Sequence, residues 1–186
     1  QCDFTLQSAF DYTQREGYIE KISEEVEVAK SLGIKAAYVE EIPFNFKIKA
    51  AIRFDNQAQF HPRKFLLPLA EMIAGSGAQI FEQSRVVNIE EGNKDGNYVL
   101  ITNQGKKVTA GKIIIASHYP CYNKQGLYFA RLYIERSYIT AIKAKEKFPG
   151  GMYITAETPG RSLRSQISDE GELILVVGEH HKTGQS

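Results

Sequence analysis

Several features that mark specialised classes of protein are weak or missing in this sequence. Its net charge is only +1, from 23 basic and 22 acidic residues, so no single-sign field is available to attract nucleic acid or an anionic membrane. No apolar run approaches the roughly 18 consecutive residues of a membrane-spanning helix, and there is no basic-then-apolar leader. Cys2 and Cys121 are too few for a disulfide framework or a four-cysteine metal site. The composition therefore predicts a cytoplasmic protein with two free thiols, no membrane span and no nucleic-acid partner.

What is present is typical of a globular protein. The chain has 186 residues, of which 42% are hydrophobic and 24% charged, which is enough for one domain, or for one domain and part of another. It begins with Gln1 and has no initiator methionine, and Ser186 follows shortly after a strongly apolar strand pattern. We therefore expect a piece of a longer protein.

The first third of the chain predicts two strands around a helix. Residues 4–12 favour a strand, and the apolar positions from Ile19 to Leu32 recur at helical spacing, with Gly33 placed to cap the helix. Residues 46–54 then alternate between apolar and mostly basic side chains, as in a half-buried strand. The basic face of this strand is either simply solvated or turned toward an acidic ligand.

The middle of the chain predicts a helix followed by short strands. Pro62 suits a first helical position, and Gly75 and Gly77 are expected to end this helix. Pro68 lies inside it and should bend it, because an interior proline removes a backbone donor. The segments expected to form strands are residues 78–84, 85–91, 98–103, 107–111 and the apolar run 112–117, with an Asp-Gly turn in the loop 92–97.

From residue 127 onward long strand patterns dominate. Residues 128–145, 151–157, 161–168 and 172–179 are rich in aromatic and β-branched side chains and are separated by short turns. The sequence as a whole predicts an α+β fold: a mixed or antiparallel sheet with helices, plus part of an α/β domain that carries a three-strand meander.

Two glycine motifs invite a nucleotide-binding interpretation and do not support it. The glycines of GSGA, residues 75–78, close a helix, whereas a dinucleotide fingerprint opens one. GEHHKTG, residues 178–184, has its Lys-Thr pair in the wrong order for a phosphate-binding P-loop. The neighbouring His180 and His181 point to opposite sides of an extended strand, so we expect no metal site. No Ser-His-Asp or Cys-His pairing stands out from spacing alone.

A ligand-binding loop is suggested by KIIIASHYP, residues 112–120. An apolar run ends abruptly in Ser117, His118 and Tyr119, and the proline that follows cannot continue a strand. An almost wholly apolar strand is usually buried on both faces. This pattern predicts a buried strand that carries a polar loop to a ligand.

The middle of the chain also resembles a known family. HPRKFLLPLAEMIAGSGAQIFEQSRVVNIEE and KVTAGKIIIASHYP are similar to the second part of the flavin-binding domain of FAD-dependent oxidoreductases of the D-amino-acid oxidase (DAO) type. ASHYP and VVGEHHKTG resemble motifs of a subgroup in which some members carry a Rieske iron-sulfur domain. Ala-Ser-His stands where the general family has Ala-Thr-Gly.

The resemblance implies where the cofactor would lie. The backbone of Val86 would contact the adenine end of FAD, although Val86 could equally be an ordinary core valine, and Ala116, Ser117 and His118 would lie along the ribose-pyrophosphate. Residues 60–119 would then be a partial FAD-binding domain, and residues 1–59 and 120–186 a substrate-binding domain. The family's Gly-x-Gly-x-x-Gly segment is not found in the sequence, so we expect an internal fragment that binds little FAD and is inactive alone.

For the full-length protein the resemblance implies oxidation of an amine or amino-acid-like small molecule by hydride transfer to flavin, with a Rieske domain as a possible partner. A non-catalytic binding or scaffolding module on the same sheet is the alternative. No catalytic residue is assigned. The substrate candidates are two arginines that could meet an anionic group or lie on the surface, polar residues preceding the helix at 62, and side chains near the last strand: Arg53, Arg164, Gln57, Gln59, His61, Tyr138, His180 and His181.

Overall fold

The structure is a computed structural model that describes residues 2–91, 96–119, 122 and 126–184. These residues form two compact units, the first made of residues 1–69 and 135–186 and the second of residues 70–134. Cys121 and residues 92–95 of the predicted Asp-Gly turn lie outside the described residues, whereas Cys2 is a free thiol as predicted. Each unit is described by itself.

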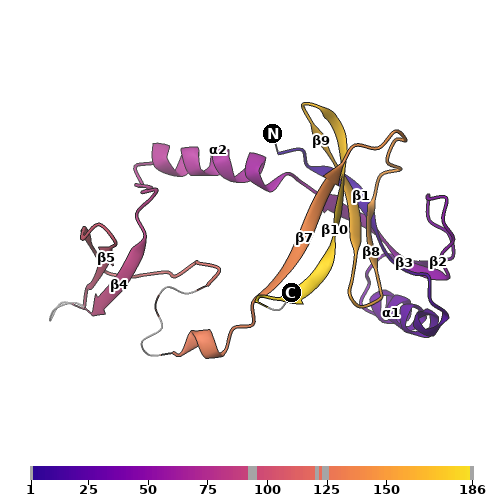
Figure 1. Ribbon diagram of the computed structural model, residues 1–186, viewed down its shortest axis with the longest axis horizontal. Coiled ribbons are helices and arrows are strands. Elements are labelled where there is room, and N and C mark those ends of the chain that lie inside the picture. Colours follow the sequence, from indigo (N-terminus) through magenta and orange to yellow (C-terminus); the bar gives the residue numbers. More distant parts are fainter. Residues whose placement is uncertain (1, 92–95, 120–121, 123–125, 185–186) are drawn as a thin grey trace. The chain divides into compact units, whose positions relative to one another are not determined.

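The first unit is built on a seven-stranded sheet with the strand order β2-β3-β1-β8-β9-β10-β7 (Figure 1). Neighbouring strands run antiparallel except β1 and β8, which pair in parallel, so the sheet is mixed. The strands are β1 (Thr5–Thr13), β2 (Ala36–Val39), β3 (Ala50–Gln59), β7 (Glu135–Ile142), β8 (Met152–Thr155), β9 (Ser162–Ser168) and β10 (Gly171–Lys182).

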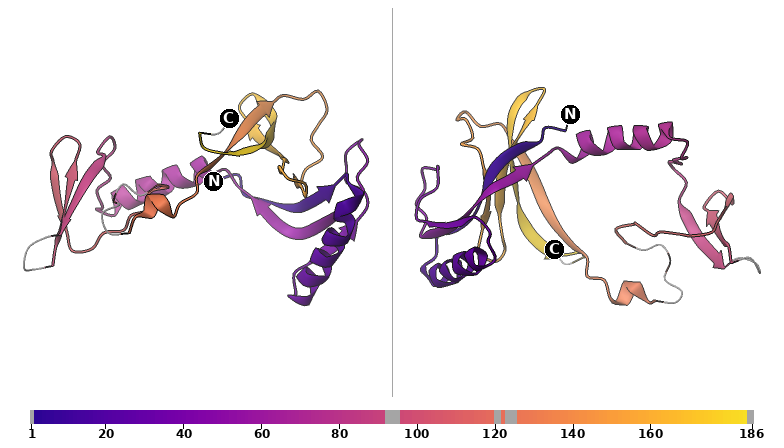
Figure 2. Two further views of the ribbon diagram at one scale, coloured as in Figure 1. Left: turned by 60° about the horizontal axis from the view of Figure 1, so that its bottom comes forward. Right: turned by 180° about the vertical axis from the view of Figure 1, so that it is seen from behind.

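One face of this sheet is covered at β2 and β3 by the helix α1 (Ile19–Ser31), which follows the short 3₁₀ turn Glu16–Tyr18 (Figures 1 and 2). Ile22, Val26 and Ala29 recur at helical spacing and pack against Ala50 and Ile52 of β3. The helix ends as predicted, because Gly33 takes the left-handed conformation, with φ of +75°, that a glycine adopts without strain.

The opposite face is covered by an aromatic cluster. Tyr12, Ala51 and Tyr153 are buried there together with Phe148 from the loop before β8, and Phe10 stacks on Tyr153 at 4.9 Å between ring centroids. Residues 43–49 form no strand, and β3 runs from Ala50 to Gln59, so the strand predicted for residues 46–54 begins and ends too early in the sequence. The face expected to be solvated is covered at Ala51, which is 0% exposed.

The helix α2 (Pro62–Gly75) begins at the predicted proline, contains Pro68, and is followed by Gly77 with φ of +94°. None of its residues is buried. Its apolar side chains, among them Phe65, Leu66 and Met72, remain exposed within the described part of the chain.

The second unit contains an antiparallel meander of β4 (Val86–Glu91), β5 (Tyr98–Thr102) and β6 (Lys107–Ala110), as predicted (Figure 2). Ile89 and Thr102 are its buried side chains among the described residues. A short 3₁₀ turn, Tyr128–Ala130, precedes β7, so the strand expected over residues 128–145 is confined to Glu135–Ile142.

Two further strand predictions for the second unit are wrong. Residues 78–84 and 112–117 form no strand, and the Ile114 side chain is 91% exposed. Apolar composition favours burial, but a strand also needs a hydrogen-bonding neighbour, and no described strand pairs with residues 112–117. Among the described residues, no helix is long and apolar enough to span a membrane.

Candidate functional site

The residues predicted to meet a cofactor lie in the second unit. Val86 is the first residue of β4, is half-buried and pairs with Thr102. A register irregularity follows it, because the next paired residue is Asn88, opposite Ile101. Such a bulge interrupts the ladder of backbone hydrogen bonds. The backbone at this point is therefore less fully engaged than in a regular strand.

Ala116, Ser117 and His118 are exposed and lie outside every described strand. The residues just before them, 111–115, line a hollow of about 540 Å³ together with Ile89 and Tyr98. A hydroxyl, an imidazole and the backbone groups of residues outside a strand can form hydrogen bonds with ribose and pyrophosphate oxygens. The residues present therefore fit part of an FAD site.

In the first unit, the candidates at the end of β3 separate into two groups. Gln59 donates to the backbone carbonyl of Ser165 at 3.4 Å, and its Oε1 is buried without a hydrogen-bond partner among the described residues. Gln59 lines a cavity of about 620 Å³ that also receives Asp3 and Lys64, joined by an ion pair of 2.8 Å. His61 lies outside this cavity lining and accepts from the Lys64 backbone N–H at the start of α2.

The side chains of Arg53 and Gln57 both interact with Asp55. The Arg53 guanidinium forms an ion pair with Asp55, with 3.0 Å between Nε and Oδ1, and the Gln57 amide donates to the Asp55 carbonyl. An arginine with a carboxylate already beside it offers less positive charge to an anionic ligand. Of the two candidate arginines, Arg53 is therefore the less available.

Near the end of β10 lie three candidates, Tyr138, His180 and His181. A bulge between Gly178 and His181 shifts the register with β7, and Glu179 has a positive φ of 54°. The His180 imidazole bonds to the carboxylate of Glu135 and, at 3.0 Å, to the Ser137 hydroxyl.

His181 faces the other way and stacks on Tyr138, with 5.3 Å between ring centroids. The two histidines thus lie on opposite sides of β10, as predicted. No group of three or more potential metal ligands occurs in the described ranges.

Arg164 lies in a groove on the sheet face that α1 partly covers. The groove has a volume of about 590 Å³, and its walls are largely apolar: Phe54, Ile139, Met152, Ile154 and Val177 line it. The Arg164 side chain forms no hydrogen bond or ion pair with another described residue. It is the predicted candidate that the structure leaves available to an anionic group.

Asp11, which sequence reasoning missed, lines the same groove. Its Oδ1 is buried without a hydrogen-bond partner among the described residues. Burial, reinforced by the carboxylates of Glu25 and Glu157, raises the pKa of Asp11 to about 6, while Lys21 acts in the opposite direction. Local sequence gave no signal for it, because Asp11 alternates in phase with the polar residues Thr5 and Gln7 of this strand.

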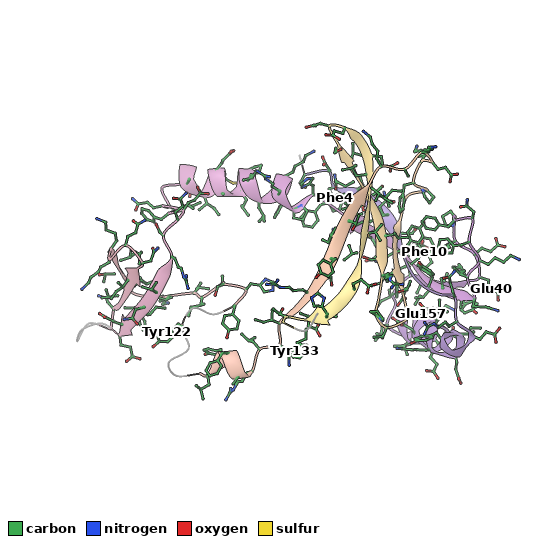
Figure 3. The ribbon with its side chains drawn as sticks, viewed as in Figure 1. Phe4, Phe10, Glu40, Tyr122, Tyr133 and Glu157 are labelled. Atoms are coloured by element: carbon green, nitrogen blue, oxygen red, sulfur yellow. The ribbon has the colours of Figure 1, made fainter. Side chains whose placement is uncertain are left out.

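Glu157, labelled in Figure 3, forms two hydrogen bonds with residues at the end of β1. Its Oε1 accepts from the Thr13 hydroxyl at 2.6 Å and from the Gln14 backbone N–H at 3.0 Å. Partial burial raises the pKa of Glu157, but these hydrogen bonds outweigh burial and leave its pKa below the ordinary value. Glu157 is therefore held as the charged form near Asp11.

Comparison with known proteins shows which family this chain resembles. The family model described as FAD dependent oxidoreductase (DAO) matches residues 1–184. A Bacillus subtilis (strain 168) protein that is named as a Rieske 2Fe-2S iron-sulfur protein, YhfW, is 37% identical over 184 residues, covering 99% of this chain and 36% of its own length.

Solved structures show a similar fold at low identity. Glycine oxidase from Geobacillus kaustophilus matches with a TM-score of 0.79 and 14% identity, over 100% of this chain and 50% of its own. Glycine oxidase from Bacillus cereus ATCC 14579 matches with a TM-score of 0.77 and 18% identity, over 98% of this chain and 51% of its own. L-proline dehydrogenase from P. horikoshii matches with a TM-score of 0.72 and 14% identity, over 100% of this chain and 51% of its own. The chain thus spans about half of these proteins and about a third of the curated relative.

Proposed function

Because this chain belongs to the FAD-dependent oxidoreductase (DAO) family, we propose that the protein containing it oxidises an amine or amino-acid-like substrate by hydride transfer to flavin. The observation that carries the proposal is the family match over residues 1–184, which includes both units. The names of the fold neighbours, two glycine oxidases and an L-proline dehydrogenase, support an amino acid as the substrate.

The two parts of the chain take different tasks in this proposal. The sheet of the first unit, within residues 1–59 and 120–186, holds the substrate, and residues 60–119 contribute to the cofactor site. FAD, when bound, supplies the electron acceptor. Val86 would present backbone groups to its adenine end, and Ser117 and His118 would meet the ribose-pyrophosphate, while Ala116 allows close approach with its small side chain.

The residues of the first unit would bind and orient the substrate. An anionic group would meet a guanidinium, and Arg164 is better suited than Arg53 because its charge is not already paired. An apolar groove excludes water and strengthens the charge interactions inside it. Three residues near the end of β10 remain substrate candidates without an assigned catalytic role: Tyr138, His180 and His181.

The experiment that tests the proposed function uses the full-length protein. We expect it to be purified with bound flavin, visible by its absorbance, and glycine, L-proline or a related amine to bleach that absorbance without oxygen. A colourless protein that FAD cannot reconstitute would refute the proposal and favour a non-catalytic binding or scaffolding module.

The isolated chain of 186 residues is expected to behave differently. We predict that it binds FAD weakly and has no oxidase activity, because Val86 and residues 116–118 offer few contacts to so large a cofactor. Titration of the chain with FAD, followed by flavin fluorescence, checks this, and a stoichiometric yellow complex would contradict it. A Rieske domain as electron-transfer partner, supported by the name of the curated relative, and a cytoplasmic location stay predictions.

A further inference from the structure

Three side chains on β7 and β10 form a relay of hydrogen bonds to which the proposed oxidation gives no catalytic role. The Ser137 hydroxyl bonds to Nδ1 of His180 at 3.0 Å, and Nε2 of the same imidazole bonds to the carboxylate of Glu135. A nucleophile, a base in contact with it and a third group that orients the base are the signature of an activated hydroxyl. Sequence spacing did not reveal this grouping, because Ser137 and His180 are 43 positions apart.

A β-bulge in β10 brings His180 into this relay. The register of β10 against β7 shifts between Gly178 and His181, because β10 contains one extra residue there. In an unshifted ladder, His180 would stand opposite Arg136 and share its face of the sheet. The extra residue turns the imidazole to the other face, where Ser137 lies. Bulges that re-aim a side chain in this way are over-represented next to active sites.

The backbone of this bulge is held in an unusual conformation. Glu179, which precedes His180, has φ of +54°, a region that residues with a side chain rarely adopt. Its carboxylate forms an ion pair with the Arg161 guanidinium, with 2.6 Å between Oε1 and Nη2. Strained backbone that the surrounding structure holds in place is concentrated at functional sites. The strain here presents the His180 imidazole to Ser137.

The partners of the two imidazole nitrogens fix their roles. A carboxylate only accepts hydrogen bonds, so Nε2, which faces Glu135, carries the hydrogen of the neutral imidazole. Nδ1 then has a lone pair and accepts from the Ser137 hydroxyl. His180 is therefore in the tautomer that can take the proton of Ser137. Glu135 is a positioning residue that stabilises the imidazolium once it forms.

Within the described part of the chain, the relay is open to a substrate. The Ser137 side chain is exposed, and 48% of the His180 side chain and 38% of the Glu135 side chain are accessible. Ile139 lies two residues along β7 from Ser137, on the same face, and is aligned with Val177 of β10. These two side chains offer an apolar surface beside the hydroxyl for the carbon chain of a substrate.

We propose that Ser137 is the nucleophile of a second activity, the hydrolysis of a carboxylic ester or thioester. Its Oγ attacks the carbonyl carbon while its proton passes to Nδ1 of His180. The bond from this carbon to the leaving oxygen or sulfur breaks, the leaving group takes the proton, and the acyl group stays on Oγ. Water then attacks the acyl group, with His180 again as the base, and releases the acid and the free hydroxyl.

The sum of these steps is ester plus water giving acid plus alcohol or thiol. No electrons are transferred, so the activity does not depend on the proposed oxidation. Aryl esters and thioesters with a short apolar acyl group fit the site best, because their leaving groups depart as stabilised anions. Such substrates place a smaller demand on oxyanion donors than an amide does.

The test uses the full-length protein and p-nitrophenyl acetate. Release of p-nitrophenol is followed by absorbance, and the acetylated residue is located by peptide mass spectrometry. The variants are Ser137→Ala, His180→Ala and Glu135→Gln. Ser31→Ala is the matched control, because the exposed Ser31 hydroxyl donates to the Val28 carbonyl and has no histidine partner.

In the parent protein and in Ser31→Ala we expect a burst of p-nitrophenol and an acetyl group on Ser137. Both should be lost in Ser137→Ala. His180→Ala should slow acylation by about 100-fold or more, the usual contribution of a general base. Added imidazole should restore part of that rate, which it would not do if His180 only held the strands together. Glu135→Gln should lower the rate of acylation and leave KM unchanged, because Glu135 does not contact the substrate.

Three results would overturn the proposal: no release of p-nitrophenol above that of buffer, the same rate for Ser137→Ala as for the parent protein, or acetylation confined to other residues. Ser137→Cys keeps a nucleophile at this position and guards against a variant that fails to fold, and it should be acetylated there too. Flavin absorbance is read on the same samples. Ester hydrolysis that depends on Ser137 in a protein without flavin would retain this proposal and refute the proposed oxidase function.

Discussion

Replacing Asp11 by asparagine should make the first unit more stable at neutral pH, although the change removes a charged group from the sheet. The pKa of Asp11 is raised from 3.8 to about 6 by burial and by the carboxylates of Glu25 and Glu157. The folded protein therefore binds this proton more tightly than the unfolded chain. The contribution of Asp11 to stability is fully present below about pH 4 and is lost as the pH rises through about 6.

The magnitude follows from the size of this change. A pKa raised from 3.8 to about 6 corresponds to about 3 kcal/mol for a fully enclosed carboxylate. Asp11 keeps some contact with solvent, which screens its neighbours, so we expect a gain of about 1 to 2 kcal/mol for Asp11→Asn at pH 7.5. The amide can also donate to a neighbouring carboxylate, which the aspartate cannot.

The assay is native-state hydrogen exchange of the β1 and β3 amides in the ligand-free full-length protein, converted to free energies of opening at pH 5 and pH 7.5. Asp169→Asn, in the exposed turn between β9 and β10, is the control and should change neither value. The difference between Asp11→Asn and the parent should shrink toward the acid side. A variant that is less stable at pH 7.5, or a difference that does not depend on pH, would refute the reasoning.

Other side chains of the first unit give further predictions. Glu157→Gln should weaken the acceptor of the Thr13 hydroxyl and cost about 1 kcal/mol; the pKa of Glu157 lies below its ordinary value, so the loss should be larger at pH 7 than at pH 4, as measured by urea unfolding. Gly151→Ala should destabilise by about 1 to 3 kcal/mol, because φ is +83° and an added Cβ would lie 2.9 Å from the Tyr153 hydroxyl; an unchanged melting temperature would contradict this. Ile52→Ala should cost about 2 to 5 kcal/mol, since Ile52 is 0% exposed, whereas Ile167→Ala, at 64% exposure, is the matched control.

Sequence periodicity correctly predicted the elements whose buried face follows from the spacing of apolar residues within one short segment. The helix α1 was found because Ile22, Val26 and Ala29 follow the helical repeat and pack on one neighbour. Residues 112–117 were interpreted wrongly for the opposite reason. Their composition is that of a buried strand, but strand formation depends on a pairing partner that local sequence does not specify, and Ile114 is 91% exposed.

In the candidate site, one residue was predicted from the sequence and another was found only from the structure. Arg164 was named from its residue type and its position in a strand, and the structure places it in an apolar groove. Asp11 was not named, because a single acid in a strand pattern is usually solvated. Only its neighbours Glu25 and Glu157, distant in sequence, and the burial of its Oδ1 distinguish it.

The sequence alone determined the class of the protein, the existence of α1, α2 and the meander, and, through its motifs, membership of the FAD-dependent oxidoreductase family. The tertiary structure decided which charges share a surface. Strand order and register bring β1 beside β8 and β8 beside β9, although more than 140 residues separate Asp11 from Arg164. Pairing between distant segments is governed by hydrogen bonding and packing across the whole sheet, and these interactions leave no local pattern in the chain.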